Sequence, residues 1–270
     1  MKDIEPEVTR RGAVGLVTAI GAITAGASIA VAQAQAAAKT FVLVHGAWHG
    51  SWCWRRVADR LERMGHKVFA PTLTGLCERS HLLSKDVSLA THTADVVNLV
   101  KWEGLEDIIL VGHSYAGIVV TQVAEQIGPS VASLVLLDAF YPQPGDSLVT
   151  MGSPAVQKLV ADGQARGEIA IKPIPAAVFN VNEKDRAWVD AQCTPHPIAT
   201  FVDKVTSVGG REKVARKTYI RAKGYNSAPF DAALAKIKTD RTWKTYEVPA
   251  GHDVMIDMPD RLVEILLEVG

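Results

Sequence analysis

The chain has 270 residues, and 48% of them are hydrophobic, which is enough for one sizeable buried core. Its 29 lysine and arginine residues balance 29 aspartate and glutamate residues, with no basic stripe or acidic tail, which argues against nucleic acid as a partner. The three cysteines, Cys53, Cys77 and Cys193, lack metal-site spacing and exclude a fully paired disulfide framework, so we interpret them as packing residues.

Residues 1–38 predict an export leader rather than part of the fold. A polar start is followed by Arg10-Arg11, a mild apolar run and overlapping A-x-A sites, the pattern of a cleaved signal peptide of the twin-arginine route. The alternative is an uncleaved membrane anchor, because Gly12–Val31 is just long enough to span a bilayer. The A-x-A sites favour cleavage, so we expect a periplasmic or secreted protein without stable membrane association.

From residue 39 onward, short apolar runs alternate with helical patterns. The runs typical of strands buried on both faces are TFVLVHG (40–46), HKVFAPTL (66–73), DIILVGH (107–113), SLVLLDAF (133–140), KTYIRAKG (217–224) and WKTYEVPAG (243–251). Helical patterns lie at Trp54–Met64, Ser88–Glu103, Tyr115–Ile127 and Arg261–Val269, the last with Asp260 as its N-cap. This alternation predicts an α/β fold with an open, doubly wound, mainly parallel sheet.

The stretch from about 141 to 216 interrupts the alternation. It is too long for one connection and contains two helix-like pieces, Ser153–Ala165 and Glu183–Gln192. We therefore predict one domain, residues 39–270, with a helical lid inserted between two strands.

A candidate nucleophile, Ser114, lies in ILVGHSYAG, where a predicted buried strand meets a predicted helix. Gly112, Ala116 and Gly117 surround it, and small residues are needed where a strand and a helix approach closely at a sharp turn. Such a turn presents the hydroxyl at the carboxyl edge of the sheet, above a helix N-terminus. Ala116 departs slightly from the usual G-x-S-x-G pattern, and the alternative is an ordinary turn serine.

A serine nucleophile needs a base, and eight histidines compete for that role. His252 is favoured because it follows the last predicted strand and precedes the last predicted helix, in a loop that opens at the same sheet edge. His66 and His92 lie in a strand and a helix, His113 points away from Ser114, and His196 falls in the lid.

The developing oxyanion needs backbone donors, and LVHGAWHG places a loop at the end of the first strand. We predict the N–H groups of Ala47 and Tyr115 as these donors, with His45 bracing the loop. Trp48 and Tyr115 are candidate substrate-binding residues, and ordinary core packing is the alternative for these and the neighbouring aromatic residues.

Taken together, FVLVHGAWHGSWCW, PTLTGLCERSHLL, VGHSYAG, LLDAFYP and AGHDVM resemble the α/β-hydrolase superfamily over nearly all of the chain after the leader. The chain is most similar to a bacterial esterase branch with pyrethroid hydrolases and the carbendazim-hydrolysing esterase, and more distantly to plant methyl esterases and hydroxynitrile lyases. The resemblance implies a Ser–His–acid esterase without a cofactor or metal, acting on a small-molecule ester such as a xenobiotic, under a lid that forms much of the pocket. The resemblance does not decide whether the chain forms a homodimer.

The acid is less certain from the sequence than the serine and the histidine. Many members place it after the strand read here as KTYIRAKG, where this chain has Asn226 and no acid until Asp231. Asp138 ends the preceding strand, and a carboxylate at that position needs a partner because desolvation alone is costly. We favour Asp138, with Asp231, Asp240 or a dyad assisted by a backbone carbonyl as alternatives.

The predicted function is a serine carboxylesterase for a small apolar or aromatic ester. An amide or carbamate hydrolase would use the same residues. A hydroxynitrile lyase is disfavoured because Asp253 stands where such plant enzymes carry a lysine, and an intact Ser114 and His252 disfavour a non-catalytic ligand-binding protein.

Overall fold

The structure, a computed structural model, describes residues 37–270. The predicted leader, residues 1–38, lies outside the described residues except for its last two positions. The described part forms one compact unit.

Six parallel strands form the central sheet, in the order β2-β1-β3-β4-β7-β8. Their bounds are β1 Thr40–Val44, β2 Lys67–Phe69, β3 Ile108–His113, β4 Val131–Leu137, β7 Arg216–Ala222 and β8 Trp243–Val248. Val44 is paired with Gly112, and Leu137 is paired with both His113 and Ile220, so the central strands end level with one another. The loops that follow these strands therefore meet at one edge of the sheet.

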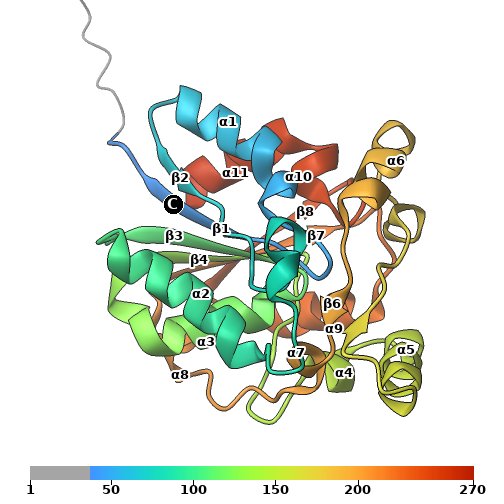
Figure 1. Cartoon of the computed structure of the whole chain (residues 1–270). Coiled ribbons are helices and arrows are strands. Elements are labelled where there is room, and N and C mark those ends of the chain that lie inside the picture. The colour runs from blue at the N-terminus through green and yellow to red at the C-terminus, as the bar shows by residue number, and fades with distance from the viewer. Residues whose placement is uncertain (1–36) are drawn as a thin grey trace, which may run out of the picture. The chain divides into compact units, whose positions relative to one another are not determined.

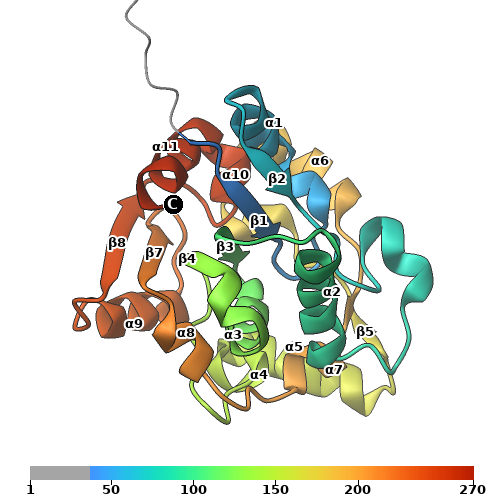
Figure 2. The ribbon, with the colours of Figure 1, turned by 90° about the vertical axis from the view of Figure 1, so that its left-hand side faces the viewer.

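Helices cover both faces of the sheet, as the alternating pattern predicted (Figure 2). One face carries α1 Arg55–Arg63, which follows the 3-10 turn η1 Ser51–Trp54, together with α10 Val254–Asp257 and α11 Pro259–Val269. The other face carries α2 Leu89–Trp102, α3 Ala116–Ile127, α8 Gly209–Lys213 and α9 Ala228–Ile237, and η2 Cys77–Leu82 and η3 Gly128–Ser130 are 3-10 turns in connections. Among residues 37–270, no helix combines the length and hydropathy needed to cross a membrane.

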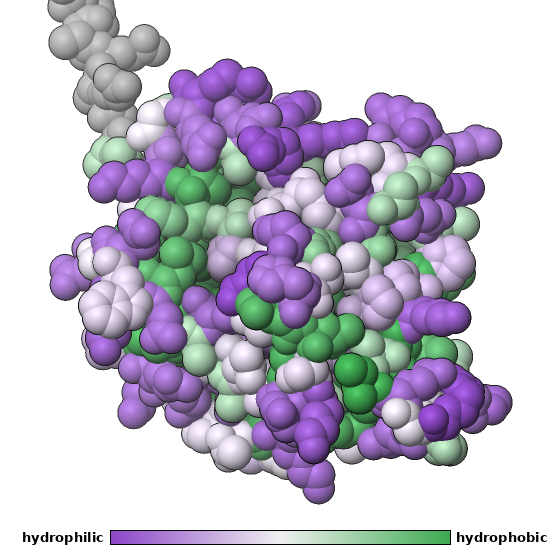
Figure 3. Space-filling model, in the orientation of Figure 1, coloured by the Kyte–Doolittle hydropathy of each residue, from purple (hydrophilic) through white to green (hydrophobic). Residues whose placement is uncertain are grey.

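The segment between β4 and β7 is the insertion predicted as a lid, and it is called the lid below (Figure 1). Besides α8, it contains α4 Leu148–Met151, α5 Pro154–Ala165, η4 Ala176–Phe179, α6 Glu183–Gln192, α7 Ala199–Val202 and a two-stranded antiparallel pair, β5 Ala170–Ile171 with β6 His196–Pro197. Figure 3 shows hydrophobic residues reaching the surface between α5 and α7, on a face whose outer parts are mostly hydrophilic.

Helix ends agree with local capping chemistry, with one correction. Ser88 caps α2 and Ser153 caps α5 through their side chains, so both helices begin one residue after the first residue of the predicted range. The prediction that Asp260 caps the last helix is wrong, because α11 begins at Pro259 and its N-cap is Met258. Proline favours the first helical position, since its fixed φ suits the helix and its missing N–H would have no partner there.

Candidate active site

Ser114 lies in a strained turn between β3 and α3. Its φ of 54° is in the left-handed region, which is uncommon for a residue other than glycine. Backbone hydrogen bonds hold it there: its N–H donates to Leu137 O at 3.2 Å, and its carbonyl accepts from the N–H groups of Gly117 and Phe140. The turn brings the residue to the wall of a cavity at the carboxyl edge of the sheet.

Two glycines allow this turn to pack closely against its neighbours. A Cβ added at Gly117 would collide with the carbonyl oxygen of Phe140, in the connection after β4. A Cβ added at Gly46, after β1, would lie 2.9 Å from Ser114 Cβ. The small residues around the serine are therefore required by the packing of three strand ends.

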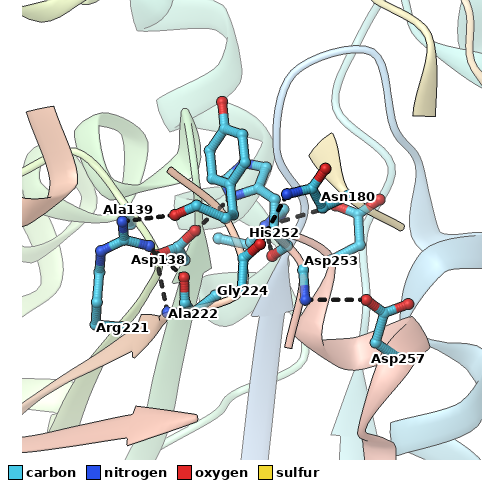
Figure 4. A network of polar contacts seen from close by, with 12 residues as sticks. Asp138, Ala139, Asn180, Arg221, Ala222, Gly224, His252, Asp253 and Asp257 are labelled. Atoms are coloured by element: carbon cyan, nitrogen blue, oxygen red, sulfur yellow. Dashed lines mark hydrogen bonds and ion pairs between the residues drawn. The ribbon is translucent and has the colours of Figure 1, made fainter. Parts of the chain in front are cut away.

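Asp138 lies directly after β4 and is fully buried. Its Oδ2 accepts a 2.6 Å hydrogen bond from Nδ1 of His252, and its Oδ1 accepts from the backbone N–H of Ala222 and from Nη1 of Arg221. Figure 4 shows Asp138 between Arg221 and His252. These bonds orient the carboxylate, and the guanidinium offsets the cost of burying its charge.

His252 is held by its backbone and by aromatic packing. Its N–H donates to Phe179 O at 2.9 Å, and its ring stacks on Phe230 with an interplanar angle of 15°. The rings of Tyr225, Phe179 and His113 lie within 5.3 Å of it, centroid to centroid. Because Nδ1 is bonded to Asp138, Nε2 is the ring nitrogen left for chemistry, and His252 borders the same cavity as Ser114.

The alternative carboxylates lie elsewhere. Asp231 is in α9 and accepts from Nε of Arg221 at 3.0 Å, whereas Asp138 accepts from Nη1 of the same guanidinium. Asp240 accepts from Thr242 in the turn before β8. Asp138 is thus the carboxylate that is hydrogen-bonded to the His252 ring, and Arg221 bonds to both Asp138 and Asp231. Sequence reasoning missed Arg221, although a basic residue inside an apolar strand is itself a signal that a buried anion is near.

The loop after β1 presents the N–H of Ala47. His45 donates from Nδ1 to Gly46 O at 2.8 Å and accepts at Nε2 from the N–H of Leu73, so it braces the loop as predicted. Burial lowers the pKa of His45 to about 3, which keeps the ring neutral. Gly46 O and the Ala47 N–H belong to the same trans peptide and point in opposite directions. The bond from His45 to Gly46 O therefore turns the Ala47 N–H the other way. Neither this N–H nor that of Tyr115 donates to an acceptor within residues 37–270.

The cavity has a volume of about 640 Å³ and a largely apolar wall. Its polar side chains are Ser114, Ser153, Tyr225, Asn226, Ser227 and His252, together with the indole of Trp48. No lysine, arginine, aspartate or glutamate of the described chain borders it. The lid supplies much of the remaining wall, including Leu148, Leu159 and Phe179. Such a cavity fits an uncharged ligand of modest size.

Trp48 and Tyr115, the two aromatic residues predicted to contact the substrate, differ in their position. Trp48 borders the cavity, where Phe179 and Phe201 pack against its ring. The Tyr115 side chain does not border it, because the ring is fully buried behind the turn and its hydroxyl bonds to Nδ1 of His92 at 3.0 Å. The prediction that the Tyr115 ring contacts the substrate is therefore wrong. Trp188 packs edge-on against Trp52, outside the cavity wall.

A parallel sheet with a serine in a strained turn, a carboxylate and a histidine at its carboxyl edge defines the hydrolase class of α/β proteins. Comparison with known proteins agrees: the model of the alpha/beta hydrolase family matches residues 41–265. The chain belongs to the α/β-hydrolase family, as its motifs predicted.

Similar proteins extend this result. The carbendazim hydrolyzing esterase of Nocardioides sp. (strain SG-4G) is 43% identical over 240 residues, covering 85% of this chain and 99% of that protein. Putative methylesterase 13 of Arabidopsis thaliana is 26% identical over 249 residues, covering 86% of this chain and 56% of that protein. An extracellular α/β-hydrolase from a Paenibacillus species has the same fold, with a TM-score of 0.76 at 23% identity, covering 86% of this chain and 99% of that one. The esterase names agree with the predicted class, a carboxylic ester hydrolase.

Proposed function

We propose that the chain is a serine carboxylesterase that hydrolyses a small apolar or aromatic ester through Ser114, His252 and Asp138. The observation that carries the proposal is the 2.6 Å bond between Asp138 and His252 at the wall of an apolar cavity that Ser114 also borders. The relative at 43% identity is named an esterase, which supports the reaction class.

In the proposed first half-reaction, His252 Nε2 takes the Ser114 hydroxyl proton as Oγ attacks the ester carbonyl carbon. The Ala47 and Tyr115 N–H groups stabilise the oxyanion of the tetrahedral intermediate. His252 then gives its proton to the leaving alcohol as the C–O bond breaks, which leaves an acyl-enzyme. Asp138 fixes the Nδ1–H tautomer and stabilises the imidazolium without taking a proton.

In the second half-reaction, water attacks the acyl-enzyme while His252 takes a proton from it, and the acid is released when Ser114 regains the proton. The cavity bounds the substrate class, because its wall has no ionisable acid or base among the described residues other than His252 and Tyr225. A charged ligand would lose its hydration there without a partner. We therefore propose an uncharged substrate.

The test is hydrolysis of a short and a long p-nitrophenyl ester by the wild type and three variants. Ser114→Ala should abolish turnover, and Asp138→Asn should lower kcat by roughly 10⁴-fold, as for other neutralised triad acids. Asp231→Asn is the matched control, because it removes the other carboxylate bonded to Arg221 and leaves the Asp138–His252 bond in place. A near-normal Asp138→Asn would refute the proposed acid. A folded wild type that hydrolyses neither ester, but cleaves amides or carbamates, would move the function to those bonds.

A further inference from the structure

The loop that presents Ala47 has an unusual backbone at the next residue. Trp48 has a φ of 66°, in the left-handed region that costs a non-glycine residue free energy. The peptide between Ala47 and Trp48 is fastened at both ends: His49 Nδ1 lies 2.8 Å from Ala47 O, and the Trp48 N–H donates to His196 Nδ1 at 3.2 Å. The conformation of this loop therefore depends on histidine side chains.

The two partners of His49 set its protonation. Nδ1 faces the Ala47 carbonyl, and Nε2 lies 3.1 Å from Oδ2 of Asp253. A carbonyl and a carboxylate can only accept, so both ring nitrogens must carry protons for both bonds to form. In the described chain, the other histidines bonded through both nitrogens, His45, His92 and His196, each have a partner that can donate to one of them. His49 is thus arranged as an imidazolium.

Asp253 supplies the opposite charge. It is fully buried and follows His252 directly in the chain, yet its side chain bonds to the loop after β1. Its second oxygen, Oδ1, accepts no hydrogen bond in the described structure and lies 3.8 Å from Nε2 of His113. An aspartate buried in this way needs a cation, and His49 is the side chain within hydrogen-bond distance.

We propose that His49 and Asp253 are a buried imidazolium–carboxylate pair that positions the Ala47 oxyanion loop and ties it to the loop of His252. The inference rests on the proposed function. Both residues are positioning residues, since neither borders the cavity. When His49 loses one proton, a single N–H remains for two acceptors. That N–H bonds to the Asp253 carboxylate, and Ala47 O loses its donor.

The surroundings make the pair respond to rising pH. Burial alone would lower the pKa of His49, but the charge and hydrogen bond of Asp253 outweigh it and raise the pKa above its ordinary value. Asp253 itself has a lowered pKa, because its histidine partners outweigh its burial. The other titratable groups facing the pair are His252 and six groups that burial keeps uncharged, namely His45, His113, His196, Cys53, Cys193 and Tyr225. None of these six groups supplies a second cation when His49 loses its proton.

The first experiment reads the pair without turnover. ¹⁵N NMR of histidine-labelled Ser114→Ala protein, with His49→Gln used for assignment, should show both His49 ring nitrogens protonated at pH 7. A neutral His49 tautomer at that pH would overturn the proposal, whatever the enzyme hydrolyses.

The second experiment is the pH profile of kcat for p-nitrophenyl ester hydrolysis. In the wild type, kcat should fall at alkaline pH as His49 loses its proton. In Asp253→Asn, a neutral His49 can donate to Ala47 O and accept from the new amide, so the alkaline fall should disappear while kcat at pH 7 stays within roughly tenfold. Asp260→Asn, at an exposed aspartate paired with Arg60, is the matched control. An alkaline fall unchanged in Asp253→Asn would overturn the proposal.

Coupling provides the third readout. His49→Gln should lower kcat by roughly 10- to 100-fold with little change in KM, because it misplaces an oxyanion donor and leaves Asp253 unpaired. Adding Asp253→Asn should restore part of that loss, since a neutral amide pair replaces the ion pair. Additive losses would refute the coupling. Failure of the proposed function is recognised separately, by hydrolysis that survives in Ser114→Ala or is absent in the folded wild type.

Discussion

Replacing His92 by glutamine should make the domain less sensitive to acid. His92 is fully buried on α2, where Nε2 donates to Thr74 O at 2.9 Å and Nδ1 accepts from the Tyr115 hydroxyl. Burial outweighs the hydrogen bond to Thr74 and lowers the pKa of His92 from 6.5 to about 4. A glutamine side chain can offer the same donor and acceptor without titrating.

The magnitude follows from proton linkage. Because the folded pKa lies below the unfolded one, the unfolded state binds more protons between them, and stability is present above pH 6.5 and is lost as the pH falls toward 4. Between pH 7 and pH 5 the loss from this single histidine is about 2 kcal/mol of the free energy of unfolding. It is set mainly by the unfolded pKa, since the folded site is almost unprotonated at pH 5.

The assay is urea unfolding of the wild type and His92→Gln at pH 7 and pH 5. The variant should lose about 2 kcal/mol less than the wild type over this interval. His81→Gln, at an exposed histidine on the η2 turn, is the matched control for the chemical change alone. Equal losses in the wild type and His92→Gln would refute the conclusion that His92 is buried in its neutral form.

Three further changes test the packing around the site. Gly117→Ala should lower the free energy of unfolding by about 1–3 kcal/mol and reduce kcat, because its methyl group meets the Phe140 carbonyl, and unchanged urea unfolding would contradict the close approach. Arg221→Met should cost about 3–5 kcal/mol, because it leaves the buried Asp138 carboxylate without its cation, and a stability equal to that of the wild type would show that the ion pair is dispensable. Leu159→Trp should raise KM for a long p-nitrophenyl ester more than for a short one, since the lid side chain borders the cavity, and an equal effect on both would place the acyl chain elsewhere.

The sheet and its edge were predictable because parallel strands leave strong local patterns. Continuous apolar runs marked the strands, and Ser114, Asp138 and His252 each follow one of them, so their meeting at one edge needed only the topology of the fold. The preference for Asp138 over Asp231 could be argued from the cost of burying a charge. The bond that distinguishes them depends on how Arg221 divides its guanidinium between the two carboxylates, which no local pattern specifies.

Side-chain direction and lid packing were beyond the sequence. Tyr115 follows Ser114 directly, yet the turn sends its ring toward His92 instead of the cavity. The cavity wall combines Ser153 and Leu159 of the lid with Tyr225 and Phe230 from the region after β7, and these contacts join positions about 70 residues apart. Local periodicity contains no information about which of these surfaces will face each other.

The histidines illustrate most clearly the difference between what the sequence predicts and what the structure adds. The sequence contains eight histidines as candidates for one catalytic role. In the structure, His45, His92 and His196 each link one donor to one acceptor around the loop after β1 and the serine turn. A neutral imidazole carries its donor and its acceptor on separate ring nitrogens, so it can link two groups that lie too far apart to share one hydroxyl oxygen. The same arrangement requires these rings to stay neutral, which ties the acid limit of stability to the residues that shape the site. His49 departs from this pattern, since it faces two acceptors, and that is why its charge, rather than its presence, is the property to test.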